Sequence, residues 1–210
     1  MNPRQHCRIS VRKRGGVEDD YYPIHAFIDS TKSLCADGRH RVLHTHWAIQ
    51  YVLVPIFGHT IVNSSGKPVD VKDLCERDHL LVDYGNAFIP SLSDFVSAIV
   101  VDNEVALRRD IEAFHQTFAQ DAAVSELMLS PLTVTGDIKS LLITHNSWFV
   151  NAVLPQVFDH PPQLTDFTIG PARVFNDMRF EPWMDNGLVT APSARRLANL
   201  RVTRDLRAAQ

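Results

Sequence analysis

The sequence predicts a mainly α-helical protein, with an N-terminal helical bundle that carries a short β-hairpin and with an inserted helical hairpin behind it. Three observations predict this class. Apolar residues recur at helical spacing along most of the chain, one short stretch alternates as β-strands do, and capping residues and helix breakers divide the remainder. The 210 residues, of which 45% are hydrophobic and 21% charged, suffice for one substantial core.

The first hundred residues are expected to hold a short N-terminal arm or helix and then a series of longer helices. The arm ends in a basic stretch and Gly15-Gly16, which predicts a turn. Residues 60–71 alternate around Asn63-Ser64-Ser65-Gly66, which predicts the β-hairpin. The longer helices are expected at residues 21–34, from 39 to the breakers at 55–58, from 73 to 85, and from a capping box at 91–94 to about 101.

The second half of the chain has a different character. An amphipathic helix is expected from Asn103, with a break at Pro131 and a more apolar helix over residues 135–158, and together these form the helical hairpin. Residues 159–192 show little periodicity and are expected to wrap over a surface as irregular chain. The Arg-rich tail from Ser193 is expected to be helical. The sequence shows no internal repeat.

Charge and cysteine content exclude several classes of protein. The 21 basic and 24 acidic residues give a net charge of -3, so no bulk field favours nucleic acid or an anionic membrane. Three irregularly spaced cysteines without a C-x-x-C pair fit neither a disulfide framework nor a thiolate zinc ribbon, and they indicate a reducing cytoplasm. The start is polar and no stretch approaches the ~20 apolar residues of a membrane span, so a cytoplasmic location is expected.

Histidine is concentrated near the start of the chain, where seven of the ten lie before residue 80. Three expected helices each carry two potential metal ligands four residues apart, a spacing that places both side chains on one helix face. Facing helices of a bundle can present such pairs to a common point, and imidazole and carboxylate suit zinc, manganese or iron. The predicted metal ligands are His25, Asp29, His40, His44, His79 and Asp83.

Other polar residues near these pairs are candidates for catalytic roles. Glu76, three residues before His79, is a candidate extra ligand or general base. Lys32 and Arg41 are candidates for holding an anionic group, because their donors match phosphate oxygens. Plainer interpretations stay open: a solvated helix residue for Glu76, salt bridges to nearby aspartates for the two cations, and a surface or core position for any single histidine.

A set of residues across the first ninety positions keeps its spacing over several expected elements. These residues are His6, Ser10, Arg12-Lys13, Gly15-Gly16, Asp20-Tyr21, Pro23-Ile24-His25, Asp29, Lys32, His40-Arg41, His44, Phe57-Gly58, Ile61, Asn63-Ser64, Gly66, Val69, Val71, His79, Asp83, Gly85 and Ile89-Pro90. The pattern resembles a known family, an uncharacterised domain of unknown function found in small bacterial and phage proteins. The resemblance covers about half of the chain and implies a bacterial or phage origin. It adds His6 to the candidate set and supplies no activity or substrate.

The resemblance also implies a domain arrangement. In the family a Pro-Trp-Met segment follows soon after the fourth helix, whereas the similar Glu181-Pro182-Trp183-Met184 comes about eighty residues later here. Residues 102–178 are therefore expected to be an insertion between a helical core at 1–101 and a return segment with the Arg-rich helix at 179–210. Trp183 is expected to pack back on the core.

Two classes of function stay open. One is a metal-dependent hydrolase acting on a phosphate-containing substrate, such as a nucleotide. The other is a non-enzymatic phage or bacterial protein that binds a host protein or joins a larger assembly, with a structural histidine cluster. The expected partner is accordingly an anionic small molecule or a protein, and a homo-oligomer stays open. The arginines of the tail are a weak nucleic-acid footprint, and no Walker loop, G-x-S-x-G elbow or H-E-x-x-H helix narrows the choice.

Overall fold

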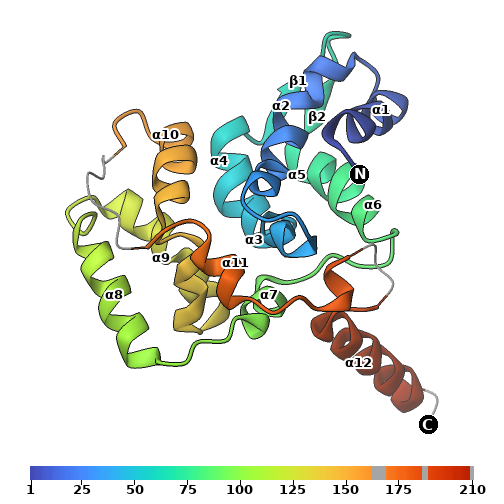
Figure 1. Cartoon of the computed structure of the whole chain (residues 1–210). Coiled ribbons are helices and arrows are strands. Elements are labelled where there is room, and N and C mark those ends of the chain that lie inside the picture. Colours follow the sequence, from blue (N-terminus) through green and yellow to red (C-terminus); the bar gives the residue numbers. More distant parts are fainter. Residues whose placement is uncertain (162–168, 186–188, 209–210) are drawn as a thin grey trace.

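The fold is mainly helical with one small β-hairpin, as the sequence predicts. A computed structural model describes residues 1–161, 169–185 and 189–208, with side chains described up to residue 200. Figure 1 shows α1, α2 and the hairpin at one end of the molecule, α8 to α10 at the other, and α12 projecting from the body. No helix in the described ranges is both long and apolar enough to cross a membrane.

The first two helices pack against each other at the hairpin end. α1 (Pro3–Arg14) begins with a capping box at Asn2, and the chain turns through Gly15 and Gly16, which both have positive φ. α2 (Glu18–Ile28) follows immediately and contacts α1 along its length. The hairpin itself is confirmed: β1 (Thr60–Val62) pairs antiparallel with β2 (Pro68–Asp70).

The long helices predicted for the first half are shorter and more irregular than expected. The segment predicted as a helix over 21–34 ends at Ile28 and continues as the short 3₁₀ helix η1 (Ser30–Ser33). His44 leaves the helical conformation and Thr45 is extended, so that its hydroxyl caps a new helix through Ala48 N. The predicted second helix is therefore divided at this point into η2 (Gly38–Leu43) and one continuous helix, which runs through α3 (His46–Ala48), the π segment η3 (Ile49–Leu53) and α4 (Val54–Phe57).

The third predicted helix is continuous but contains a π-helical stretch. It runs through α5 (Val71–Leu74), the π segment η4 (Cys75–Leu80) and α6 (Leu81–Asp83), and it begins under a cap from Asp70. The fourth, α7 (Leu92–Ala98), starts with the predicted capping box of Ser91 and Asp94 and ends at Ile99, a little earlier than expected. The third predicted helix carries the last two of the six candidate ligands, His79 and Asp83.

The expected break at Pro131 is wrong. α8 (Glu104–Gln116) and α9 (Ala122–Thr135) are separated by a turn at 117–121, and Pro131 lies inside α9. Proline leaves the carbonyl of Leu127 without its usual helical donor. The hydroxyl of Ser130 donates to that carbonyl at 2.7 Å and accepts from Trp47 Nε1 at 2.8 Å, which allows the helix to continue.

The second half repeats the order of elements of the first, a repeat that the sequence did not reveal. In each half two helices precede a six-residue 3₁₀ helix capped by an aspartate, Asp37 in the first half and Asp137 in the second. A five-residue π segment and a four-residue helix with Pro55 or Pro155 at its second position come next. The second set consists of η5 (Ile138–Ile143), η6 (Phe149–Val153) and α10 (Leu154–Val157). These elements lie 100 positions after η2, η3 and α4 respectively.

The proline in each copy explains the π segment before it. Proline cannot donate to the carbonyl four residues earlier, so the preceding turn widens into the π form. The two helices that carry these prolines, α4 and α10, contact each other and stand side by side in Figure 1. The two copies therefore meet at equivalent elements.

The final segment returns to the first half. α11 (Arg173–Asp177), the short 3₁₀ helix η7 (Pro182–Met184) and α12 (Pro192–Ala208) complete the described chain, and residues 162–168 of the expected irregular segment lie outside it. Trp183 packs edge-on against Phe95, with ring centroids 5.0 Å apart. The larger hydrophobic core joins both halves through residues that include Trp47, Phe95, Leu107, Phe149 and Trp183.

Candidate metal centre

Four buried side chains from separate segments of the first half converge on one point. Asp29 caps the C-terminus of α2, and His44 ends η2 where the chain changes direction. His79 lies in the π segment η4, and Asp83 ends α6, one turn later on the same face. One donor atom from each of the four lies within 4.8 Å of every other, and no side chain of the four is more than 5% exposed.

The distances suit a small cation with tetrahedral ligands. His44 Nε2 lies 3.2 Å from Asp83 Oδ2 and 3.5 Å from Asp29 Oδ1. His79 Nε2 lies 3.7 Å from Asp29 Oδ1 and 3.8 Å from Asp83 Oδ2. Zinc ligands at about 2.0–2.2 Å in a tetrahedron stand about 3.3–3.6 Å apart, so these four atoms could surround one ion with little movement.

Several atoms of the cluster lack a hydrogen bond of good geometry although they are buried. His79 Nε2 and both carboxylate oxygens of Asp29 have no such partner, even though charged groups lie within ion-pair distance. A buried polar atom without a partner carries a substantial desolvation cost. A bound cation would satisfy all three atoms at once, and this donor chemistry is the main indication that the cluster fits a metal.

His25 supports the cluster from behind and is not among the converging four. Its Nδ1 lies 3.0 Å from Nδ1 of His79, and its Nε2 lies 2.9 Å from the hydroxyl of Ser10. With His79 donating to His25 and His25 donating to Ser10, the lone pair of His79 Nε2 points toward Asp29 and Asp83. Hydrogen bonds of this kind fix the tautomer of a metal-binding imidazole.

The electrostatics of the cluster keep its two carboxyls ionised and favour the neutral form of His79. Burial pushes the pKa of Asp29 upward, but His44 and His79 beside it outweigh burial and hold that pKa below its usual range. The same balance, with His44 and His6 as partners, lowers the pKa of Asp83. Burial lowers the pKa of His79, so that its neutral form, the form that binds metals, is favoured.

His40 lies at the edge of the cluster and is not one of the converging ligands. Its Nδ1 is 2.5 Å from the carbonyl oxygen of Asp37, three residues earlier in the 3₁₀ turn. Burial lowers its pKa to about 4, and its Nε2 is buried without a partner. The ring packs edge-on to that of His44 at 5.8 Å between centroids. The four-residue spacing does not place the rings of His40 and His44 on one helix face, because His44 lies beyond the end of η2.

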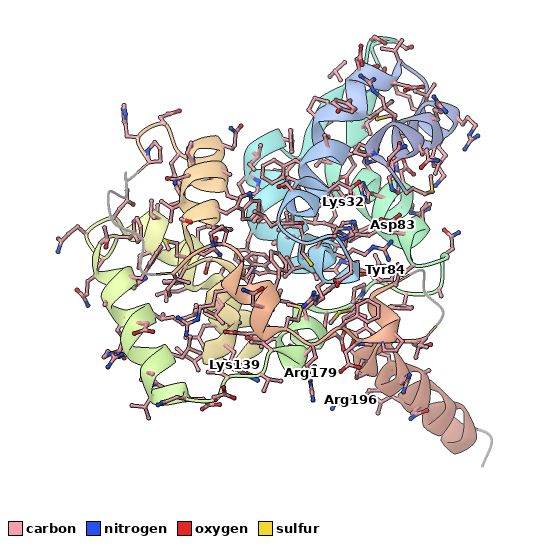
Figure 2. All side chains as sticks on the ribbon, viewed as in Figure 1. Lys32, Asp83, Tyr84, Lys139, Arg179 and Arg196 are labelled. Atoms are coloured by element: carbon pink, nitrogen blue, oxygen red, sulfur yellow. The ribbon has the colours of Figure 1, made fainter. Side chains whose placement is uncertain are left out.

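The three predicted catalytic side chains occupy different surroundings. Lys32 is 37% exposed with its Nζ 2.8 Å from Asp29 Oδ1, at the outer edge of the cluster, and Figure 2 labels it together with Asp83. Arg41 is buried, stacks over the Tyr84 ring and donates to the carbonyl of Met184 at 3.0 Å. Glu76 points elsewhere: its carboxylate lies 3.1 Å from the ring of the exposed His46.

His6 is also buried against the cluster. Its ring stacks on that of His79 with centroids 3.7 Å apart, and its Nε2 lies 3.2 Å from Asp83 Oδ1. Helical spacing within α1 gives no sign of this role, because the candidate partners of His6 are all on other elements. Only the family resemblance pointed to it.

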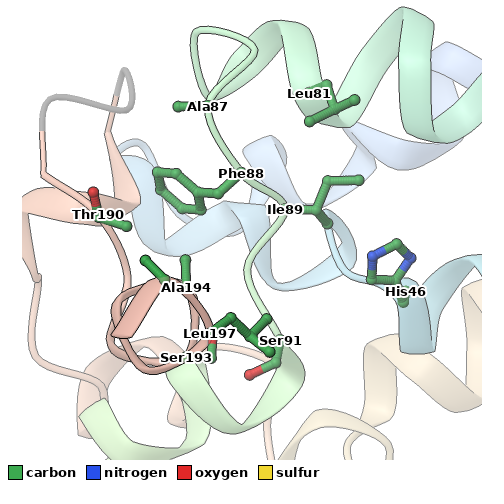
Figure 3. Close-up of a pocket in the computed structure, with 11 residues that line it drawn as sticks. His46, Leu81, Ala87, Phe88, Ile89, Ser91, Thr190, Ser193, Ala194 and Leu197 are labelled. Atoms are coloured by element: carbon green, nitrogen blue, oxygen red, sulfur yellow. The ribbon is translucent and has the colours of Figure 1, made fainter. Parts of the chain in front are cut away.

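An apolar cavity in the described residues lies apart from the cluster. It has a volume of about 540 Å³ between α12 and the segment after α6, and its walls include Phe88, Ile89 and Leu197 (Figure 3). Its lining is mainly apolar and contains none of the four converging ligands. On the outer side of the cluster, Lys32 Nζ contacts the carbonyl of Met1.

Comparison of the sequence with known protein families gives one match. Residues 1–105 match the domain of unknown function DUF6915. The chain belongs to this family. The match to DUF6915 contains every residue of the candidate centre. No curated protein and no solved structure matches the chain.

Proposed function

We propose that this DUF6915 protein is a metal-dependent hydrolase that acts on a phosphate-containing substrate, with Asp29, His44, His79 and Asp83 holding a divalent ion. Zinc, manganese and iron all accept this set of imidazole and carboxylate donors. The single observation that carries the proposal is the convergence of four buried donors, several of them without hydrogen-bond partners.

The ion supplies the chemistry that the side chains lack: it lowers the pKa of a bound water toward neutrality. The remaining roles fall to the residues around it. Lys32, with its exposed ammonium beside Asp29, is placed to bind an anionic substrate at the edge of the cluster. Arg41 lies 3.9 Å from Asp83 Oδ2 and holds the return segment beside that carboxylate through Met184. Its part is to orient Asp83.

A structural ion is the second candidate, and one observation favours it. All four ligands are at most 5% exposed, and none lines the cavity between α12 and the segment after α6. Closed four-ligand sites commonly stabilise a fold and leave no position open for water or substrate. In that case the ion would join α2, η2 and η4, and any function would reside in binding a protein partner.

Hydrolysis assays on the full chain distinguish the two candidates. The protein is freed of metal, reloaded with zinc, manganese or ferrous iron, and offered a panel of nucleotides and phosphate mono- and diesters. The hydrolase proposal predicts turnover that depends on the ion and falls roughly 100-fold or more in Asp83→Asn. His46→Gln, which alters an exposed histidine next to the centre, serves as the matched control and keeps full activity.

Lys32→Ala refines the same test. Because Lys32 lies at the rim and the four ligands stay in place, its loss is expected to raise KM for an anionic substrate more than it lowers kcat. A loaded protein that turns over no phosphate ester, but loses thermal stability when the ion is removed, would rule out the hydrolase and establish the structural ion.

A further inference from the structure

We infer that Asp83 joins two cation positions, and that the second position lies between Asp83 Oδ1 and His6 Nε2. This inference rests on the proposed metal binding at the first position. The two oxygens of Asp83 face different groups. Oδ2 points to His44 Nε2 at 3.2 Å and to His79 Nε2 at 3.8 Å, whereas Oδ1 points to His6 Nε2 at 3.2 Å.

The surroundings of His6 determine which of its nitrogens carries hydrogen. His6 Nδ1 lies 2.9 Å from the carbonyl oxygen of Asp78, and a carbonyl can only accept, so Nδ1 is the donor. In the neutral ring Nε2 then has a lone pair, and it faces a carboxylate oxygen that also only accepts. His6 is 0% exposed, and its Nε2 has no hydrogen bond of good geometry. Two buried acceptors that face each other require a positive charge close to both.

A positive charge already lies at this position. The α-amino nitrogen of Met1 is 2.8 Å from Asp83 Oδ1. The carboxylate of Asp78, in contrast, is neutralised by Lys13 and Arg14 on the other side, so only its carbonyl reaches His6. The structure therefore accommodates a cation at Asp83 Oδ1 and presents an imidazole nitrogen to it.

The stacking of two imidazoles gives the spacing of the two positions. The rings of His6 and His79 are nearly parallel, at 8°, with centroids 3.7 Å apart. Each ring directs its Nε2 to one oxygen of the same carboxylate, His79 to Oδ2 and His6 to Oδ1. Paired metal ions in hydrolytic sites stand about 3.5–4 Å apart. One bridging carboxylate and two parallel imidazoles therefore match the geometry of a two-ion site.

The two positions differ in their number of protein ligands, and this difference predicts their order of filling. The first has four side-chain donors, while the second has only His6 and the shared Asp83. The second ion is therefore the weaker one and keeps positions free for water or for a ligand. A phosphate group that places one oxygen on each ion fits this arrangement, which narrows the substrate class to phosphate esters bound across two ions.

Binding of Mn²⁺ alone to the full chain tests the inference. Titration is followed by calorimetry and by electron paramagnetic resonance, which detects the magnetic coupling of two close Mn²⁺ ions. Wild type is expected to bind about two equivalents, one tightly and one weakly, with a coupled spectrum at saturation. His6→Phe keeps a flat ring on His79 but removes the nitrogen ligand, and it is expected to bind about one equivalent, uncoupled.

The outcomes separate this inference from the proposed function. One equivalent in wild type, or two coupled equivalents in His6→Phe, overturns the second position. No binding by wild type overturns the first position as well. His145→Phe, a buried histidine of the second half, is the matched control and keeps two equivalents. If His6→Phe is misfolded by circular dichroism, His6→Asn replaces it, with the same expectation.

Discussion

Buried histidines outside the metal centre make the stability of this protein sensitive to acid. His145 is fully buried, faces His115 Nδ1 with its Nε2 at 3.0 Å, and has its Nδ1 near the carbonyl of Leu141. Burial lowers its pKa to about 3, against 6.5 in an exposed chain. Because the unfolded state takes up the proton first, the stabilisation is complete above pH 6.5 and declines as the pH falls toward 3.

The predicted effect is a slope in the free energy of unfolding. Between pH 6.5 and 4, His145 contributes up to ~1.4 kcal/mol of lost stability per pH unit. Urea titrations of His145→Leu at several pH values should therefore give a shallower dependence than wild type. The exposed His59, changed to Gln, is the control and leaves the slope unchanged. Equal slopes in wild type and His145→Leu would show that the burial of His145 does not make the stability sensitive to acid.

Ser130 connects the two halves through a single hydroxyl. It donates to the carbonyl that Pro131 leaves without a helical donor, and it accepts from Trp47 Nε1. Ser130→Ala leaves both buried groups unpaired, so the free energy of unfolding should fall by about 1–3 kcal/mol, measured in urea. Ser33→Ala removes an equivalent hydroxyl on the surface and should change stability by less than about 0.5 kcal/mol. Equal effects would show that Ser130 does not support the helix.

The sequence located the centre better than it assigned the individual ligands. Asp29, His44, His79 and Asp83 were among its candidates and do converge. His25 fulfils a supporting role because its two nitrogens are taken by Ser10 and His79. Such a role depends on which atom each ring nitrogen faces, and spacing along a helix carries no information on that point.

Among the elements, the return segment depends on a glycine in η2. An ideal Cβ on Gly38 would lie 2.6 Å from the carbonyl oxygen of Met184, so only glycine permits this approach. Gly38→Ala should cost about 1–3 kcal/mol and increase hydrogen exchange at 178–185. Gly170→Ala, whose Cβ would meet nothing within 4 Å, is the control. Unchanged exchange in Gly38→Ala would mean that the segment is held elsewhere.

Helix boundaries explain why local structure was only partly predictable. Apolar periodicity indicated helices correctly but did not show that His44 and Thr45 interrupt one of them, because the break comes from backbone angles at polar residues. Pro131 was taken as a breaker, whereas the neighbouring Ser130 replaces the lost hydrogen bond. The helix expected over residues 135–158 includes Pro155, which does lie in a helix after a π segment. The error at Pro131 arises from a contact that forms only in the fold.

At the scale of the molecule, the two halves share one hydrophobic core. The larger cluster contains Trp47 and Phe95 from the DUF6915 region together with Phe114, Phe149 and Trp183 from the rest. Heating should therefore produce one cooperative transition, with a calorimetric enthalpy equal to the van't Hoff enthalpy. Two separate transitions would show that the halves fold independently.

The repeated order of elements escaped the sequence because few side chains are shared. The caps Asp37 and Asp137 and the prolines Pro55 and Pro155 recur, but the second copy has no counterpart of His79 and Asp83 in the described residues. Its polar interior is instead the chain of contacts from Ser125 through His115 to His145. The first copy carries the candidate metal centre, and the second completes its core.

Elemental analysis of untagged protein shows most directly whether Asp29, His44, His79 and Asp83 bind a metal ion. Wild type and His44→Ala are purified in parallel, with His46→Ala as a control whose exposed ring lies only two residues away. If the four residues bind a metal ion, wild type and His46→Ala contain at least about one equivalent of zinc, manganese or iron, and His44→Ala loses it. An equal metal content in wild type and in folded His44→Ala, or no metal in any of the three even after loading, would contradict it.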